Sequence, residues 1–342
     1  TYSEFAIYEW HNDSIVLKVK YPLHSITQIS SIEIKNKITF DFESEQIEII
    51  AKNSVQIGYR VLNILCTLYN INELPQLQNL QPIGFWPDPA LRFSLTKQIT
   101  PEVLNDLRSK FDEDPDTFSL STFSNYINDL PLLLESAQAN IDIKDIFCDV
   151  QLTPEYIRAI AEFLPKNKNF TTLTFAESFQ TVNFDSIFSI LSNGQNPLRK
   201  FKFKTQSDPS QFDFIVKIIT SVPVDTLEFD ECIDGNDASK LFDILSSIEQ
   251  FQHIPKISLK SIHISSIDNL CNLLSCSKKI SLDSCDIEVI PFLQKLTEVN
   301  KQIECINLRG NLGNTFNNTT IHLPKTLNKI KLDMISWKGA TF

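Results

Sequence analysis

The sequence predicts an α/β fold in which short strands alternate with helices along most of the chain, after a smaller β-rich module. One observation is the stretch IECINLRGN at 303–311, with apolar residues at its first, fourth and sixth positions and Asn311 at its last. The other is that this pattern recurs along the chain at steps of 23 to 30 residues. A period of that size is typical of a solenoid, in which each unit buries the apolar face that its neighbour leaves open.

The copies share an apolar triplet, which a leucine-rich repeat places on one short strand. The triplets are Ile143-Ile146-Cys148, Phe170-Leu173-Phe175, Leu198-Phe201-Phe203, Val224-Leu227-Phe229, Ile254-Ile257-Leu259, Ser277-Ile280-Leu282, Ile303-Ile306-Leu308 and Leu327-Ile330-Leu332, and a weaker copy at Phe118 and Leu120 precedes them. We expect their middle members to form one continuous interior row. The position equivalent to Asn311, which bonds backbone where the chain leaves the strand, holds Gln151, Ser178, Gln206, Cys232, Ile262, Cys285, Asn311 and Ile335.

Between the strands, apolar residues at helical spacing predict helices that return the chain. They cover residues 154–166, 212–220, 238–247, 267–274 and 290–299, whereas the polar segment 314–320 is expected to return without a helix. Such repeats predict a horseshoe with a parallel sheet on the concave side and helices outside. We assign residues 115–342 to this domain, with about eight or nine repeats. We expect it to be truncated, because the last repeat stops at Phe342 without a polar cap.

Residues 1–70 predict a different module. Alternating apolar and polar residues indicate half-buried strands at 15–19, 38–42 and 46–50. After them, one helical face carries the apolar residues Val61, Leu62, Leu65, Leu68 and Tyr69. A small antiparallel sheet closed by one helix is the plan of a pleckstrin-homology-like β-barrel. Because 70 residues are few for that fold, we expect the module to be incomplete.

Residues 71–114 are predicted to be a connector. Prolines interrupt regular structure at Pro75, Pro82, Pro87 and Pro89. The apolar content of the segment indicates that it packs on a domain. Near its end, Pro101 stands where a helix can begin, and apolar residues follow at helical spacing. We therefore predict one short helix before the repeats.

Two segments resemble the CARMIL family, the linkers of capping protein, the Arp complex and myosin-I. They are VQIGYRVL at 55–62, in the helix that closes the first module, and DVQLTPEYI at 149–157, leading to FTTL at 170–173. The order of module, connector and repeats is also similar over nearly the whole chain. The resemblance implies a cytoplasmic scaffold that regulates actin filament assembly, can dimerise and can meet the membrane or cortex. It also implies that the capping-protein-binding segment lies in a C-terminal tail outside this sequence.

Composition and charge argue against several classes of function. The chain has 31 Lys and Arg residues against 42 Asp and Glu, a net charge of −11, which argues against nucleic acid as the partner. Its five His and seven Cys residues show no metal-ligand, triad or Cys-x-x-Cys spacing, and no Gly-rich phosphate loop occurs. We therefore expect no enzymatic activity and no cofactor or metal, and we expect reduced thiols in a cytoplasmic protein. No apolar run reaches the roughly 18 residues that a membrane span requires.

The candidate partner-binding site is the concave face of the sheet. Its basic residues are Lys200, Lys202, Lys204, Lys256 and Lys260. One interpretation is a dock for an acidic peptide or an anionic protein. The other is that these lysines form salt bridges to Glu228 and Asp230 on the neighbouring strand.

A charge ladder is predicted on the same face. The position after the last core residue of each repeat reads Asp149, Ala176, Lys204, Asp230, Lys260, Asp283, Arg309 and Asp333, and its sign alternates from Lys204 onward. Parallel strands lie roughly 4.8 Å apart, so each charge would stand beside two of opposite sign. The ladder is either structural neutralisation or a binding stripe.

A second candidate surface lies in the first module, where Lys18, Lys20, Lys35 and Lys37 are candidates for contact with anionic lipid. Residues 1–70 hold six basic and eight acidic residues, which favours a solvated sheet edge instead. The sequence thus predicts a non-enzymatic scaffold for protein partners. The alternatives are a GTPase-activating or inhibitor-type leucine-rich-repeat protein and a membrane-recruited adaptor.

Overall fold

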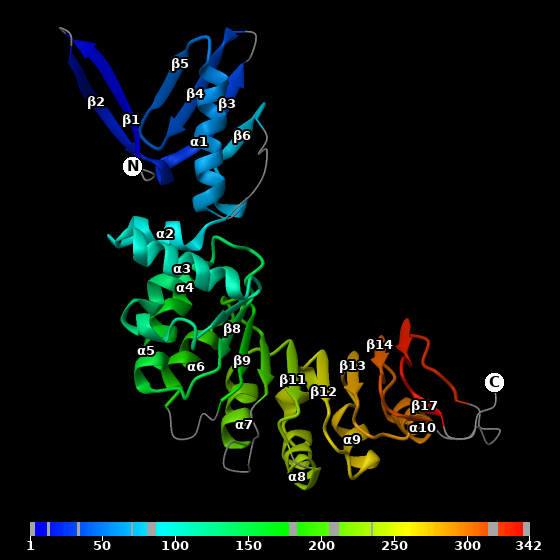
Figure 1. Cartoon of the computed structure of the whole chain (residues 1–342). Helices are drawn as coiled ribbons and strands as arrows, with labels where there is room; N and C mark the ends of the chain where they lie inside the picture. Colours follow the sequence, from blue (N-terminus) through cyan, green and yellow to red (C-terminus); the bar gives the residue numbers. More distant parts are fainter. Residues whose placement is uncertain are drawn as a thin grey trace. The chain divides into compact units, whose positions relative to one another are not determined.

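In the computed structural model, the structure describes residues 4–11, 14–32, 35–69, 71–80, 87–177, 183–204, 212–233, 235–313 and 321–337. The chain divides into two compact units (Figure 1). Unit 1 comprises Thr1–Pro115 and Leu132–Ile143, and unit 2 comprises Asp116–Pro131 and Lys144–Phe342. The predicted division into residues 1–70, 71–114 and 115–342 stays a prediction.

Unit 2 is built on a parallel sheet with nine described strands (Figure 1). They are β7 (Thr117–Ser119), β8 (Asp145–Cys148), β9 (Thr172–Phe175), β10 (Lys200–Phe203), β11 (Thr226–Asp230), β12 (Lys256–Lys260), β13 (Lys279–Asp283), β14 (Cys305–Asn307) and β16 (Lys329–Lys331). Each strand pairs with that of the preceding repeat. Every predicted repeat, including the weaker copy at Phe118, therefore contributes one strand.

The predicted interior row is confirmed. Strand pairing aligns Phe118, Ile146, Leu173, Phe201, Leu227, Ile257, Ile280, Ile306 and Ile330 one after another. All except Ile330 are at most 2% exposed. Ile330 is only half-buried, because β16 is the edge strand. The chain is thus an α/β solenoid of the leucine-rich-repeat type.

Between successive strands, helices return the chain along one side of the sheet (Figure 1). They are α5 (Pro154–Phe163), α6 (Asp185–Leu191), α7 (Phe212–Ser221), α8 (Gly235–Ser246), α9 (Ile267–Leu273) and α10 (Val289–Val299). The sequence predicted all of them but α6. It also missed α4 (Leu130–Ala137) before β8. The segment predicted to return without a helix, 314–320, lies outside the described residues; after it, β17 (Ser336–Trp337) pairs with β15 (Leu312–Gly313).

Phenylalanine rings stack in the core behind three neighbouring strands. The ring centroids of Phe175 and Phe203 lie 5.4 Å apart, and those of Phe203 and Phe229 lie 5.3 Å apart. The ring planes differ by 14° and 19°, and each ring is at most 1% exposed. Phe can replace Leu here because a core position requires apolar volume rather than one residue type.

Unit 1 contains two sheets among its described residues. Strand β1 (Glu4–His11) pairs with β2 (Ser14–Pro22). The second sheet has the order β5-β4-β3-β6, formed by β3 (Ile26–Ile32), β4 (Lys37–Phe42), β5 (Gln46–Ile50) and β6 (Gln76–Gln78). The described strands therefore do not form one closed barrel, and β6 runs parallel to β3. The sequence missed β1, β3 and β6.

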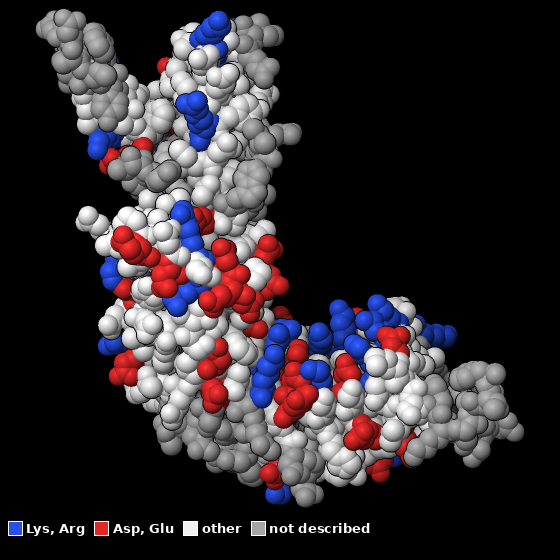
Figure 2. Space-filling view, viewed as in Figure 1, with Lys and Arg blue, Asp and Glu red and all other residues white. Residues whose placement is uncertain are grey.

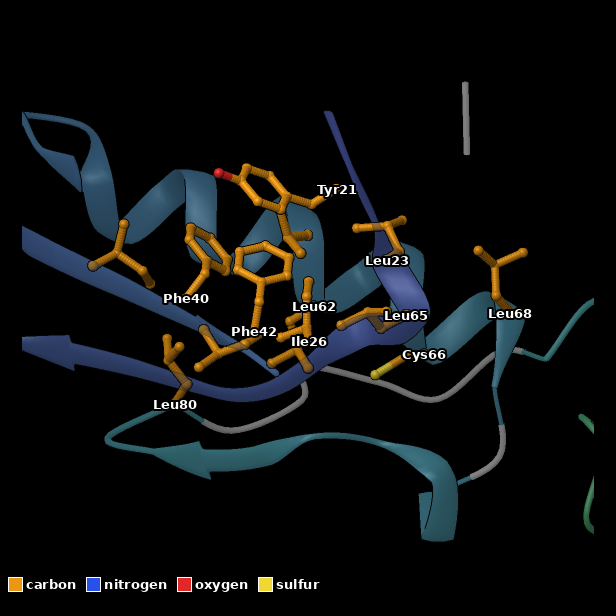
Figure 3. Close-up of a cluster of buried hydrophobic side chains, with 13 residues drawn as sticks. Tyr21, Leu23, Ile26, Phe40, Phe42, Leu62, Leu65, Cys66, Leu68 and Leu80 are labelled. Carbon is orange, nitrogen blue, oxygen red and sulfur yellow. The ribbon is translucent and has the colours of Figure 1, made fainter. Parts of the chain in front are cut away.

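Helix α1 (Ser54–Leu68) packs on the second sheet of unit 1. Its predicted apolar face is confirmed by the burial of Val61, Leu62, Leu65 and Leu68. Figure 3 shows Leu62 and Leu65 of α1 in one cluster with Phe40 and Phe42 of β4. The ring of Phe5 on β1 lies 4.9 Å from that of Phe40, so the hairpin contributes to the same core.

The connector contains two helices, one of which the sequence missed. The predicted helix is α3 (Pro101–Glu113). Pro89 was expected to interrupt regular structure, but it begins α2 (Pro89–Thr96). The Asp88 carboxylate accepts a hydrogen bond from Leu91 N at 2.9 Å, which caps the helix. Proline is tolerated in a first helical turn because its missing N–H would have had no partner there.

Candidate docking surface on the parallel sheet

The side of the parallel sheet opposite the helices carries exposed and half-buried residues on most of its described strands, but on β9 Thr172 and Thr174 are buried. Successive side chains of a strand point to opposite sides, so alternate residues reach this face. In β10, Phe201 and Phe203 are buried, whereas Lys200 and Lys202 are half-buried. Parallel pairing sets equivalent positions side by side, so the exposed residues form rows across the strands. Figure 2 shows charged side chains of both signs gathered along this part of unit 2.

Charges on β8 to β11 compensate one another. Lys200 Nζ lies 3.5 Å from a carboxylate oxygen of Glu228, which is the salt bridge that the second interpretation expected. Lys202 Nζ lies 3.5 Å from Asp145 on β8, rather than beside the acids of β11. Asp145 also accepts hydrogen bonds from the Thr174 hydroxyl at 2.7 and 2.9 Å. This half of the exposed face therefore offers little free charge to a ligand.

Burial shifts the pKa values of two of these groups in the direction that favours the neutral form. Burial raises the pKa of the Asp145 carboxyl, against the opposing effects of Thr174 and Lys202. Burial likewise lowers the pKa of Lys200, which the charge of Glu228 partly offsets. Both pairs are partly desolvated, with side chains 14–29% exposed, so that breaking either pair leaves a partly buried charge without compensation.

The predicted charge ladder is present across three strands. Lys260 Nζ lies 2.9 Å from Asp230, and pairing places Asp283 on its other side. The hydrogen bond to Asp230 raises the pKa of Lys260, and the charge of Asp283 acts in the same direction. Lys204 departs from the ladder, because its ammonium lies 5.6 Å from the centroid of the Phe147 ring in a cation–π contact.

The exposed face of β12, β13, β14 and β16 carries excess positive charge. At its first position, Lys256, Lys279, Cys305 and Lys329 stand side by side. We call Lys256, Lys279 and Lys329 the lysine row. Within the described residues, no acidic group lies at ion-pair distance from any of the three. The exposed positions of these four strands hold five lysines and one acid, Asp283, in a chain whose net charge is −11.

Sequence reasoning identified Lys256 but missed Lys279 and Lys329. The predicted charge ladder lies at the position after the last core residue of each repeat, whereas the lysine row lies at the position before the middle core residue. The signal was present, because each of the three directly precedes a member of the interior row. A row at one fixed repeat position becomes visible once the strands are aligned on their buried residues.

Short polar side chains lie next to the lysine row. The second exposed position on β12, β13 and β14 holds Ser258, Ser281 and Asn307, which we call the middle row. Asn307 Nδ2 donates a hydrogen bond to Ser281 Oγ at 2.9 Å. These groups are small and can donate and accept hydrogen bonds. They leave the surface beside the lysine row open to the main chain of a ligand.

Buried Asn311 holds the turn that follows β14. Its side chain is fully buried and accepts hydrogen bonds from Cys285 N at 3.0 Å and Ile287 N at 3.1 Å. It donates to Leu282 O at 2.6 Å and to Leu308 O at 2.9 Å. For Asn311 the predicted role is confirmed, because each polar group of its amide bonds backbone of its own or the preceding repeat. Gln151, at the equivalent position of the first full repeat, is exposed.

A second set of buried asparagines precedes the strands and was not predicted. Asn167 Nδ2 donates to Asn196 Oδ1 of the next repeat at 2.8 Å. Asn300 donates to two backbone carbonyls of the preceding repeat at 2.6 and 2.9 Å. These residues fix the opposite ends of the strands. The predicted turn residues Ser178 and Gln206 lie outside the described residues.

The candidate lipid-contact residues of unit 1 are separate positions on its strands. Lys20 Nζ lies 2.8 Å from Glu4, and Lys37 forms an ion pair with Glu48. Lys18 and Lys35 are exposed. Contact of these lysines with lipid stays a prediction.

The described residues contain no group of three His, Cys, Asp or Glu side chains placed to hold a metal ion. None of the described helices is both long enough and apolar enough to cross a membrane. All seven cysteines are free thiols, and five of them are buried.

Comparisons with known proteins find similarity among solved structures. No protein-family model matches the chain, and no curated protein matches it. Among solved structures, an internalin from Listeria monocytogenes is similar with a TM-score of 0.32 and 10% sequence identity. The alignment covers 60% of this chain and 58% of that chain, so the chain spans less than two thirds of the internalin's length. The fold, a solenoid like that of leucine-rich-repeat proteins, follows from the strand pairing and burial described above.

Proposed function

We propose that this chain is a protein-interaction scaffold that binds partner proteins on the exposed face of its parallel sheet. The observation that supports this most is the lysine row, in which uncompensated cations stand side by side on a face whose other charges are largely paired. Like charges on neighbouring strands repel. A partner of opposite charge would remove that repulsion. The proposal requires no catalytic step, cofactor or metal.

The proposal extends to the actin cytoskeleton. The resemblance of residues 55–62 and 149–157 to the CARMIL family supports a cytoplasmic regulator of filament assembly that acts near the membrane or cortex and can form a homodimer. These segments belong to α1 and to the turn into α5. A pleckstrin-homology-like identity for the first module, with lipid contact through Lys18, Lys20, Lys35 and Lys37, belongs to the same proposal.

Purified proteins provide the test. The immobilised chain is offered actin, the Arp complex and myosin-I in turn, and binding is measured by interferometry. We expect at least one to bind, and Ser258→Trp to weaken binding because it places a large side chain on the exposed face. Ser246→Trp, on the exposed side of α8, serves as the control.

The outcomes separate the parts of the proposal. Binding that Ser258→Trp and Ser246→Trp weaken equally would argue against the exposed face as the docking surface. If none of the three proteins binds, the actin role fails. Stimulated GTP hydrolysis by a small GTPase would favour the GTPase-activating alternative instead.

A further inference from the structure

We propose that the lysine row and the middle row together bind an extended acidic segment of a partner protein, which lies across β12, β13, β14 and β16. This inference rests on the proposed function and specifies the chemistry of the partner. The segment carries carboxylates at alternate positions. Its side chains pair with Lys256, Lys279 and Lys329, and its main chain lies over the middle row.

The charges on β12 and β13 provide an internal comparison. At the third exposed position, Lys260 stands beside acids on both neighbouring strands. At the first exposed position of the same strands, Lys256 stands beside Lys279. The two positions lie on the same face of the same two strands and have the same spacing between strands. Because the fold compensates charge at one position and leaves it uncompensated at the other, the lysine row is not explained by sheet stability.

The dimensions of the lysine row match an extended peptide. Three strand steps separate Lys256 from Lys329, and parallel strands lie roughly 4.8 Å apart, so the row spans about 14 Å. An extended chain rises about 3.4 Å per residue and places alternate side chains on one side. Three acidic residues at alternate positions therefore span about the same length. The peptide would run across the strands, so side chains rather than sheet hydrogen bonds would hold it.

The middle row suits the main chain of such a peptide. The hydroxyls of Ser258 and Ser281 and the amide of Asn307 are short and can bond peptide N–H and C=O groups. Cys305, half-buried between Lys279 and Lys329 in the same row, would lie beneath the segment.

Net charge favours a short segment over a larger polyanion. At physiological ionic strength, charges are screened over about 8 Å, so a short peptide senses mainly the local lysines. A membrane surface or a nucleic-acid duplex would also meet the acidic remainder of a chain whose net charge is −11.

A defined probe tests the proposal. It is a fluorescein-labelled peptide of about twelve residues with Glu at alternate positions and Ser between them, long enough to cross the four strands. Its affinity is measured by fluorescence anisotropy at low and high salt. We compare the unmodified chain, the variant K256E/K279E/K329E and the control K217E/K240E/K295E. The control reverses three lysines on α7, α8 and α10, on the other side of the sheet, with the same change in net charge.

We expect salt-sensitive binding that weakens at least roughly tenfold in K256E/K279E/K329E and changes less than about twofold in the control. K256Q/K279Q/K329Q, which introduces no new acid, should fall in between. A peptide in which Gln replaces every Glu should not bind. As a second readout, the acidic peptide should slow alkylation of Cys305 in the unmodified chain.

Three results would overturn the proposal. One is equal weakening in the lysine-row variant and in the control, which would indicate a net-charge effect only. Another is binding of the acidic peptide with no protection of Cys305. The third is binding of vesicles containing phosphatidylinositol bisphosphate, but not the peptide, through the lysine row. The scaffold proposal is tested separately. If Ser258→Trp abolishes partner binding but the lysine-row variant does not, only the proposal of an acidic segment is refuted.

Discussion

The uncompensated lysine row makes an unusual prediction about stability: reversing the charge of Lys279 should stabilise the fold. Lys279 stands between Lys256 on β12 and the neutral Cys305 on β14. In Lys279→Glu, the repulsion with Lys256 becomes an attraction. The side chain is exposed, so the substitution buries no new charge.

The magnitude follows from the strand spacing. If splayed head groups lie about 6 Å apart, two unit charges in water interact by roughly 0.7 kcal/mol, and salt reduces this to about 0.4 kcal/mol. Changing repulsion into attraction therefore raises the free energy of unfolding by about 0.5–1 kcal/mol. The same substitution at Lys260 should have the opposite sign. Lys260→Glu removes the pair with Asp230 and adds repulsion with Asp283, for a loss of about 1 kcal/mol.

The assay is urea denaturation followed by circular dichroism, together with hydrogen exchange of the β12 and β13 amides, which reports locally on unit 2. Both variants are measured in dilute buffer and in about 0.5 M salt, where screening should reduce both differences by at least about half. If Lys279→Glu destabilises β13 as much as Lys260→Glu does, the charges of the two rows do not act as described. A difference that salt leaves unchanged would likewise contradict an electrostatic cause.

Three further predictions concern the core. Asn311→Ala should lower the free energy of unfolding by about 2–4 kcal/mol in urea denaturation, because buried backbone groups lose their partners. Gly58→Ala should lower it by about 1 kcal/mol, although alanine favours helices, because the new Cβ would overlap Cδ1 of Ile38. Iodoacetamide near pH 8 should label Cys305 and spare Cys285. Burial raises the pKa of Cys285 to about 11, so its reactive thiolate stays scarce until the pH approaches that value.

Each of these predictions has a matched control. Asn193 is exposed, and Asn193→Ala should change stability by no more than about 0.5 kcal/mol. Ile38→Val, which removes the overlapping methyl group, should restore much of what Gly58→Ala loses. Were the double variant no more stable than Gly58→Ala alone, crowding would not be the cause. Cys285 should react readily in the unfolded chain, and its rapid labelling in the folded chain would contradict its burial.

The strands of unit 2 could be predicted because the buried positions of each repeat can be recognised from the sequence of that repeat alone. The triplet with Leu227 is recognisable within its own short segment, and copies at a regular period fix which residues become neighbours. Register then follows, since each strand pairs with its equivalent in the next repeat. The same reasoning placed Asn311 at the turn after β14.

Features made by pairing between distant segments were harder to predict. The lysine row joins Lys256 to Lys329, and no local stretch of sequence displays it. Whether the strands of unit 1 close into a barrel likewise depends on strand pairing. An alternating pattern identifies a strand but does not show which strand pairs with it. Pro89 was misinterpreted because proline both interrupts helices and begins them, and the capping by Asp88 decides between the two.

The stacked rings of Phe175, Phe203 and Phe229 have a geometric consequence. Their centroids are 5.4 and 5.3 Å apart, wider than the roughly 4.8 Å between strands, so they act as wedges behind the sheet. A mismatch of about 0.5 Å at a depth of about 5 Å opens roughly 6° per strand. The next repeats carry the slimmer Leu259 and Leu282 at this position. Ring size thus widens the buried side of the sheet at β9 to β11 more than Leu259 and Leu282 do at β12 and β13, and we expect the sheet to curve more strongly there.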